Sequence, residues 1–363
     1  MIPFLSYFDH TSLSKFFFLV SLLLFPATGL PDSATTNTWH GLMRFLDAGK
    51  GSHVDGMAEL KGYFRRFGYL PDPSPPPENT NFTDIFDEQF ETALISYQKN
   101  LGLPVTGKLD YNTMRVVVSP RCGVSDITTA SGQQLKTTRR FAYFHGKPRW
   151  VRRRSTPMTL SYAFSQANVI GYVSPSDLKA VFRRAFSRWS AVIPVNFAEA
   201  EDYSLADIRI GWYHGDHGDG EAFDGVLGVL AHAFSPENGR FHLDAAERWA
   251  VDFTEEKSKE AVDLESVATH EIGHVLGLAH SSAKDAVMYP SLSPRTKKVE
   301  LRKDDVEGIQ ALYGSNPDYR YNSRLESDLS SGRGMMDLET RKGLIKCWSA
   351  AMVILACFFS LGL

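Results

Sequence analysis

The sequence predicts an α+β domain with three helices, preceded by a small all-α domain. From Trp39 to about Val118, apolar residues recur at helical spacing, whereas from Met158 onward short alternating segments appear between helices. The 363 residues, 43% hydrophobic and 22% charged, are enough for two globular domains or one large one. The net charge of −3 gives no argument for nucleic acid as a partner.

Residues 1–29 have the pattern of a secretory signal peptide. Lys15 precedes an apolar run that ends at Phe25, and Pro26-Ala27-Thr28-Gly29 supplies small residues for cleavage. The run is too short to span a bilayer comfortably, so we favour a signal peptide over a membrane anchor. The chain is therefore expected in the secretory pathway, where Asn81 of the sequon Asn81-Phe82-Thr83 would be glycosylated.

Three helices are expected in the all-α domain. The first carries Leu60, Phe64 and Phe67 on one face, and a Pro-rich loop at 73–77 separates it from the second. The second carries an apolar stripe from Phe86 to Tyr97, and a turn-rich link leads to a short third helix near Thr113.

Five strands and three helices are expected in the part of the chain that follows Met158. The strands are the segments at 159–164, 195–198, 206–213, 227–233 and 241–243. One helix begins at Ser174-Pro175 and has an apolar face suited to packing on a sheet. The others span 263–278 and 303–313, the last one ending at Gly314.

The helix at 263–278 opens the string H-E-x-x-H-x-x-G-x-x-H. His270 and His274 lie one turn apart on one face and can bind a single Zn²⁺, with Glu271 between them. Gly277 lets the chain turn back, so that His280 arrives as a third ligand. Three protein ligands leave the fourth tetrahedral position for water, as in a catalytic zinc site, and Glu271 is placed to act as general base.

Cys122 is expected to be an unpaired thiol. The other two cysteines, Cys347 and Cys357, belong to the apolar C-terminal tail. Because a thiolate is a better zinc ligand than water, Cys122 would occupy the fourth position and keep the enzyme inactive. The basic run at 149–154 is either a processing site or a solvated linker.

These motifs closely resemble those of the matrix metalloproteinases, or matrixins, of the metzincin clan. The zinc string is followed by Val287-Met288-Tyr289-Pro290, and the segment Pro120 to Asp126 resembles the matrixin cysteine switch. The segment Gln98 to Asp110 resembles the peptidoglycan-binding-like domain of matrixin propeptides. The layout is similar to that of plant matrixins that carry a glycosylphosphatidylinositol (GPI) anchor and lack a hemopexin domain.

The resemblance implies the zymogen of a zinc endopeptidase that cleaves extracellular proteins. Residues 30–154 would be an inhibitory propeptide, and 155–315 a metzincin catalytic domain with a twisted mixed sheet. Met288 would lie beneath the zinc site, while Arg121 and Asp126 would pair to hold the switch. A non-catalytic cell-surface binding protein is the alternative, but it would leave Glu271 and Cys122 without a purpose.

The same resemblance implies a second zinc and a calcium. It assigns a structural zinc to His214, Asp216, His232 and His242, and leaves His217 out. Calcium would be bound by three side chains and three backbone oxygens, those of Asp224, Asp244, Glu247, Gly225, Leu227 and Val229. Arg240 stands where an acidic ligand is usual, so a second calcium that also uses Asp207 is not expected.

Two further roles follow from the resemblance. Ser266, four residues before His270, is small and would leave a roomy S1′ pocket for a large apolar side chain such as leucine. Asp304 and Asp305 resemble the matrixin pair that ties the mature N-terminus and the methionine turn. Two charges on a solvated helix face would look the same in the sequence.

The C-terminus has the pattern of a GPI-anchor signal. Ser330-Ser331-Gly332 is a cluster of small residues, and a polar spacer separates it from the uncharged tail Trp348 to Leu363. Residues 316–331 would be a linker, Ser331 the attachment residue and 332–363 the segment removed. The mature protein would then lie on the extracellular face of the plasma membrane, with a short transmembrane tail as the alternative.

Overall fold

The computed structural model describes residues 41, 43–71, 82–127, 140–151 and 158–320. The predicted signal peptide, Asn81, Ser331 and the C-terminal tail lie outside these residues, as does part of the basic run. None of the helices described is long and apolar enough to cross a membrane.

The N-terminal part is the predicted all-α domain. A short 3₁₀ helix, η1 (Met43–Phe45), precedes α3 (Met57–Arg66), α4 (Glu88–Asn100) and α5 (Tyr111–Val117). Asp87 and Asp110 cap α4 and α5 by accepting the backbone N–H groups of Phe90 and Thr113. A core rich in aromatic rings fills the space between the helices.

The larger part is built on a six-stranded mixed sheet with three helices, so the predicted fold class is confirmed. The strands are β1 (Arg121–Cys122), β2 (Met158–Phe164), β3 (Val195–Glu199), β4 (Ile208–Tyr213), β5 (Val229–Ala233) and β6 (Arg240–Asp244). Their order is β1-β5-β6-β4-β2-β3, and all neighbours are parallel except β5 and β6. A small second sheet, β7 (Trp249–Ala250) with β8 (Val262–Asp263), was not predicted.

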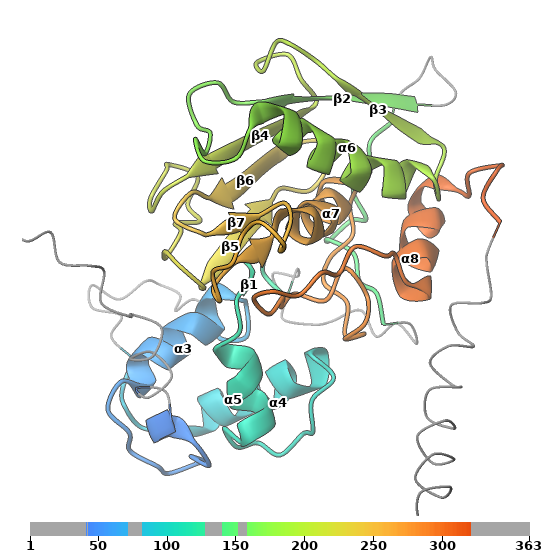
Figure 1. Cartoon of the computed structure of the whole chain (residues 1–363). Helices are drawn as coiled ribbons and strands as arrows, with labels where there is room; N and C mark the ends of the chain where they lie inside the picture. The colour runs from blue at the N-terminus through green and yellow to red at the C-terminus, as the bar shows by residue number, and fades with distance from the viewer. Residues whose placement is uncertain (1–40, 42, 72–81, 128–139, 152–157, 321–363) are drawn as a thin grey trace, which may run out of the picture.

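Helix α6 (Pro175–Ser190) and helix α7 (Leu264–Val275) pack against each other beside the sheet (Figure 1). Ser174 caps α6, and its predicted apolar face is buried from Leu178 to Trp189. Every residue of α7 is buried, and the indole N–H of Trp189 donates to the carbonyl of Thr269 within it. The catalytic histidines predicted on α7 are therefore held in a rigid core.

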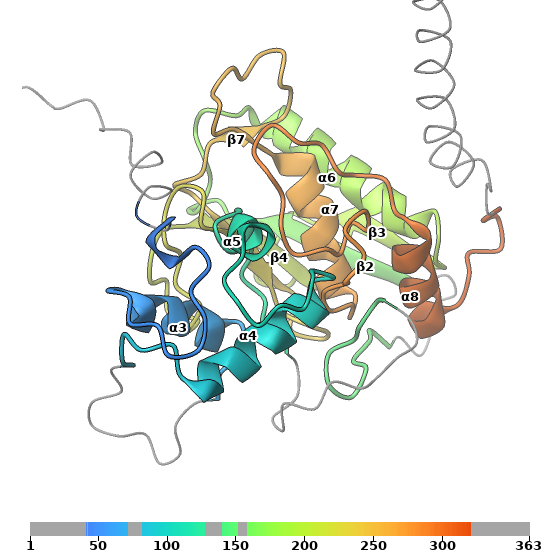
Figure 2. The same cartoon turned by 90° about the horizontal axis from the view of Figure 1, so that it is seen from below.

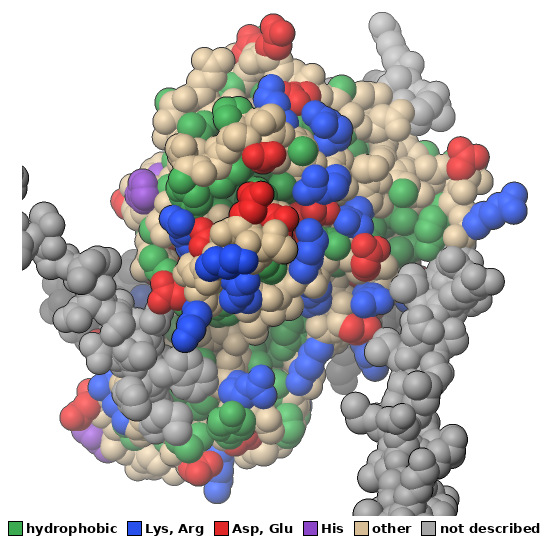
Figure 3. Space-filling model, viewed as in Figure 1, with side chains coloured by type: hydrophobic (Ala, Val, Ile, Leu, Met, Phe, Trp, Pro, Cys, Tyr) green, Lys and Arg blue, Asp and Glu red, His purple; other side chains and the backbone are tan. Residues whose placement is uncertain are grey.

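The third helix, α8 (Lys303–Tyr313), has the bounds that the sequence predicts. It lies at the far side of the sheet domain from α3, while α3, α4 and α5 form a separate lobe beneath the sheet domain (Figures 1 and 2). Strand β1 connects the lobes, because it follows α5 in the chain and pairs with β5. On the face seen in Figure 3, acidic and basic side chains are interspersed rather than segregated.

Candidate metal centres

The local structure around α7 brings three histidines together. His270 and His274 lie one turn apart, and the chain leaves the helix through Gly277 at φ 109°, a left-handed conformation that favours glycine. A Cβ at Gly277 would lie 2.3 Å from the carbonyl oxygen of Pro148, so a side chain is excluded there. The turn predicted at Gly277 is present, and it delivers His280 to the other two imidazoles.

The three imidazoles present their Nε2 atoms to one point. Nε2 of His274 lies 3.1 Å from that of His270 and 3.2 Å from that of His280. The Nδ1–H groups donate outward, that of His270 to the carbonyl of Val287 at 2.7 Å and that of His274 to Leu278 at 2.8 Å. Each Nε2 therefore carries a lone pair, and acceptor atoms in such close contact fit a shared cation.

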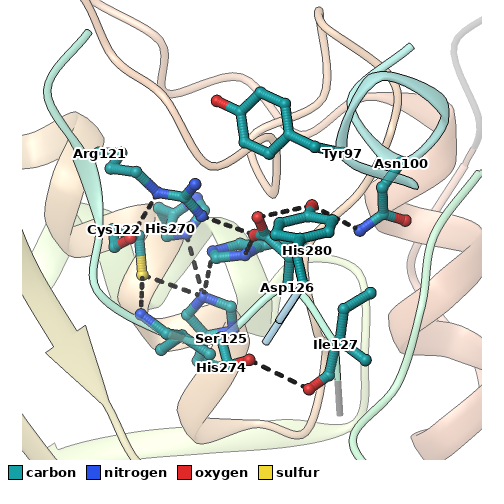
Figure 4. A network of polar contacts seen from close by, with 12 residues as sticks. Tyr97, Asn100, Arg121, Cys122, Ser125, Asp126, Ile127, His270, His274 and His280 are labelled. Atoms are coloured by element: carbon teal, nitrogen blue, oxygen red, sulfur yellow. Dashed lines mark hydrogen bonds and ion pairs between the residues drawn. The ribbon is translucent and has the colours of Figure 1, made fainter. Parts of the chain in front are cut away.

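Cys122, on strand β1 between the two lobes, completes this group (Figure 4). Its Sγ lies 3.4 Å from Nε2 of His274. The backbone N–H of Cys122 donates to the carbonyl of Pro290 at 2.9 Å, and that of Gly123 donates to Ala231 at 2.8 Å. Three nitrogens and one sulfur in a buried cluster are a donor set that suits tetrahedral Zn²⁺.

Asp126 links the loop of Cys122 to the histidines (Figure 4). Its carboxylate accepts hydrogen bonds from Arg121 at 2.6 Å, from Nδ1 of His280 at 2.7 Å and from the hydroxyl of Tyr69 at 2.8 Å. Burial opposes its ionisation, but Arg121 and His280 overcome it and lower the pKa of Asp126 to about 2. The predicted pairing of Arg121 with Asp126 is confirmed, whereas the contact with His280 was not predicted.

Glu271 is fully buried beside the cluster. Neither carboxylate oxygen is bonded to a nitrogen or oxygen of the described residues, and burial raises the pKa of Glu271 to about 8 although the nearby thiol of Cys122 opposes this shift. Such a group is costly to bury unless it meets a cation or a reacting molecule. It lines a cavity that Cys122 also lines.

Met288 lies beneath the cluster, as the sequence predicts. A Cβ built on Gly273, in the middle of α7, would be 2.3 Å from Sδ of Met288. The carboxylate of Asp305 accepts the N–H groups of Val287 and Met288 at 2.9 and 3.0 Å, so it holds the turn that carries Met288. Asp304 instead accepts a hydrogen bond from Ser281.

Comparison with known proteins agrees with this geometry. The family model described as Matrixin matches residues 149–314, and the one described as putative peptidoglycan binding domain matches 53–117. Metalloendoproteinase 4-MMP of Arabidopsis thaliana is 54% identical over 302 residues, covering 83% of this chain and 85% of that protein. The chain belongs to the matrixin family. The resemblance stated from the sequence is thereby confirmed.

More distant relatives extend the match beyond one species. Metalloendoproteinase 1 of Glycine max is 40% identical, covering 82% of this chain and 96% of that protein. Human neutrophil collagenase is 36% identical, covering 71% of this chain and 50% of that protein. This matrixin is therefore a zinc metalloendopeptidase, and its N-terminal lobe is the propeptide domain of the family.

The matrixin's second metal cluster corrects a prediction. The structure brings together His217, Asp219, His232 and His242, whereas the predicted His214 and Asp216 are exposed and lie outside the cluster. The Oδ2 atom of Asp219 lies 2.8 Å from both Nε2 of His232 and Nδ1 of His242, and 3.0 Å from Nε2 of His217. One carboxylate and three imidazoles again fit a tetrahedral Zn²⁺.

The electrostatics of this cluster also suit a cation. Burial lowers the pKa values of His232 and His242 to about 4, so both are neutral at neutral pH. Burial alone would raise the pKa of Asp219, but the N–H of Glu221 and the imidazole of His232 lower it below its usual range.

The wrong assignment came from a repeat in the sequence. His214-Gly215-Asp216 and His217-Gly218-Asp219 are identical triplets three residues apart, so both match the motif equally well. Glycines flank Asp219 on both sides with positive φ, 82° at Gly218 and 88° at Gly220. The pattern His217-Gly218-Asp219-Gly220, with a glycine on each side of the aspartate, indicates a tight loop and distinguishes the second triplet as the ligand pair.

The predicted calcium ligands gather around one loop. The N–H groups of Gly225, Leu227 and Val229 donate to the carboxylates of Asp244, Glu247 and Asp224, respectively. Burial, with Asp244 and Asp224 nearby, raises the pKa of Glu247 to about 8, and its Oε2 atom has no partner among the described residues. Three carboxylates held this way suit a hard divalent cation such as Ca²⁺, which is typical of matrixins.

Proposed function

We propose that this matrixin is a secreted zymogen whose peptide-bond hydrolysis depends on Glu271 and is blocked by Cys122. The proposal rests on one observation: three Nε2 lone pairs converge beside the buried carboxylate of Glu271 and the thiol of Cys122. His270, His274 and His280 would hold a zinc ion, which supplies Lewis acidity toward the scissile carbonyl and the attacking water.

Glu271 is the proton carrier in this proposal. Among the described residues its carboxylate interacts with the thiol of Cys122 but with no nitrogen or oxygen, and it lines a cavity together with His270. It accepts a proton from the attacking water and passes it to the departing amide nitrogen. A large apolar side chain of the substrate, such as leucine, fills the cavity behind Ser266, which is lined by Leu230, Val267 and Val287 among others.

Latency rests on three features of the Cys122 loop. The thiol takes the place that the substrate and water require, and Cys122 N–H and Gly123 N–H bind backbone carbonyls on both walls of the cleft. The buried Arg121–Asp126 pair stiffens the loop, and Arg121 stacks on the ring of Phe67 at 3.5 Å. Removal of the propeptide withdraws all of these contacts at once.

The test is Glu271→Ala in the full chain, activated by proteolytic removal of the propeptide. Cleavage of a quenched fluorescent peptide should fall by at least about 10²- to 10⁴-fold, the usual contribution of a general base. Thermal unfolding should stay close to wild type, and Glu307→Ala, on an exposed part of α8, should keep full activity. Substantial turnover by the Glu271 variant would overturn the assignment.

We also propose that the mature protein is held on the extracellular face of the plasma membrane by a GPI anchor at or near Ser331, and that Asn81 is glycosylated. The small-residue cluster, spacer and apolar tail support the anchor. A phosphatidylinositol-specific phospholipase should release the protein from intact cells. Retention after this treatment would instead support a transmembrane tail.

A further inference from the structure

A lysine lies in the wall of the cavity beside Glu271. Apolar side chains, among them Leu230, Val267, Tyr289 and Leu292, form most of this cavity. Lys298 is the one lysine or arginine that lines it among the described residues, and Cys122 lines it too. A charged amine in an apolar cavity requires a structural or functional reason.

Ser266 fixes the position of Lys298. The hydroxyl of Ser266 donates to Asp263 at 2.6 Å and accepts the backbone N–H of Lys298 at 2.7 Å. Because Ser266 is on α7, one turn before His270, this bond ties the loop of Lys298 to the helix that carries the catalytic residues. The small serine also leaves room for the lysine side chain.

The ammonium group of Lys298 has spare hydrogen-bonding capacity. Its Nζ donates to the carbonyl of Lys284 at 2.8 Å and lies 5.2 Å from the ring centroid of Tyr289, but no carboxylate of the described residues pairs with it. The neighbouring Lys297 differs, because its Nζ lies 3.2 Å from Glu265 and 3.8 Å from Asp263. An ammonium has three donors, so Lys298 keeps donors for a further acceptor.

A second polar group in the same wall points to the same ligand chemistry. The Oγ atom of Ser291 is buried and has no hydrogen-bond partner among the described residues. Burial lowers the pKa of Lys298 to about 8, which still leaves most of the group charged at pH 7. The cavity therefore combines apolar walls with an unpaired positive charge and an unpartnered hydroxyl.

We propose that Lys298 determines charge selectivity for the substrate side chain that enters this cavity, the P1′ residue. Long side chains that end in an oxygen acceptor, such as glutamate and glutamine, are admitted beside leucine and methionine, whereas lysine and arginine are excluded. The apolar walls receive the methylene stem, and the ammonium meets the tip. This inference rests on the proposed hydrolysis and on the placement of P1′ beside Glu271.

The experiment compares four peptides that differ only at P1′, with leucine, methionine, glutamate or lysine. Wild type, Lys298→Met and Lys297→Met are made as full chains and activated by the same limited proteolysis. In the wild type, kcat/KM for glutamate should exceed that for lysine by about tenfold or more, because one partly buried charge attracts the first and repels the second. In Lys298→Met this ratio should fall toward one.

Two controls separate the possible failures. Lys297→Met makes the same change of charge in the same loop outside the cavity, so it should keep the wild-type ratio. The leucine peptide should be cleaved equally by wild type and Lys297→Met, and each protein's kcat/KM for leucine is the reference against which its glutamate and lysine values are read. An unchanged ratio in Lys298→Met, or an equal fall in Lys297→Met, would overturn the inference. Failure of every protein to cleave any peptide would overturn the proposed function instead.

Discussion

The two metal clusters of this matrixin differ in the origin of their fourth donor. His270, His274 and His280 belong to α7 and the turn after it, but Cys122 comes from the propeptide lobe. The second cluster takes all four of its donors from residues 217–242 of the catalytic domain. Under the proposed zymogen mechanism, removal of the propeptide would take away the fourth donor of the first cluster and leave all four donors of the second, as expected of a catalytic and a structural site.

The two clusters also differ in the groups that surround their imidazoles. In the first, the acceptor for the Nδ1–H of His280 is Asp126, so the propeptide supplies both a donor and a partner of a donor. In the second, aromatic rings cover the imidazoles, with Phe223 stacked on His217 and His232 at centroid distances of 5.0 and 4.8 Å. The propeptide therefore contacts the first cluster through polar groups, and it contacts the second through the ring of Phe223, which also packs in the hydrophobic cluster of the propeptide lobe.

Asp219→Asn should have the largest effect on the fold, because Oδ2 of Asp219 lies within 3.0 Å of three imidazoles. We expect the zymogen to lose one equivalent of zinc and about 3–5 kcal/mol of unfolding free energy, as when a buried charge loses its partners. Metal analysis and thermal unfolding measure both. Asp216→Asn, in the exposed triplet, should change neither, and zinc loss there would restore the original assignment.

Cys122→Ser should increase activity, whereas Asp219→Asn should reduce zinc content and stability. The zymogen should become at least about tenfold more active before processing, because a serine hydroxyl is a much poorer zinc ligand than a thiolate. Its thermal unfolding should change little, since the other donors remain. The measurement is peptide cleavage by unprocessed chains, with Ser125→Ala of the same loop as a control that stays latent. A fully latent Cys122 variant would refute the switch.

The catalytic cluster could be predicted almost completely from the sequence, because its three histidines and Glu271 are fixed by helical spacing and one turn. Helix α8 was placed correctly for a similar reason, since an apolar period ends at Gly314. The second cluster depends on how two strands, β5 and β6, are placed beside one loop. Local spacing does not show whether His214 or His217 is the ligand, because that depends on the conformation of the loop.

Contacts between the lobes were the least predictable. Phe223 is buried in the hydrophobic cluster of the propeptide lobe, and Arg66 of α3 donates to the carbonyl of Ala222 at 2.7 Å. One contact within the catalytic domain is similarly distant in sequence. Lys298 reaches the cavity because its backbone N–H donates to Ser266, which lies 32 residues earlier in the chain. Such contacts join segments whose separation in sequence carries no periodic signal.

Gly273→Ala should affect the first cluster through packing alone. The new methyl group would lie 2.3 Å from Sδ of Met288 and 3.0 Å from the ring of Trp189, so one of them must move. We expect a loss of about 1–3 kcal/mol of unfolding free energy, typical of overpacking. Denaturant unfolding measures it. The control is Gly62→Ala in α3, where a Cβ would have nothing within 4 Å, and it should raise stability slightly. If both variants change the unfolding free energy equally, Gly273 is not tightly packed against Met288 and Trp189.

Phe223→Leu should show the smallest effect and test whether stacking retains the second metal ion. Leucine keeps most of the apolar burial but loses both ring stacks, which we expect to weaken the cluster by about 0.5–1.5 kcal/mol. Zinc release to a chromogenic chelator should then be roughly two- to tenfold faster, the equivalent of that free energy. Phe197, in the edge strand β3 away from β5 and β6, packs on Phe186 of α6, so Phe197→Leu should leave zinc release unchanged. If both variants release zinc at the wild-type rate, the four donors alone retain the ion, and the two clusters differ only in the origin of their ligands.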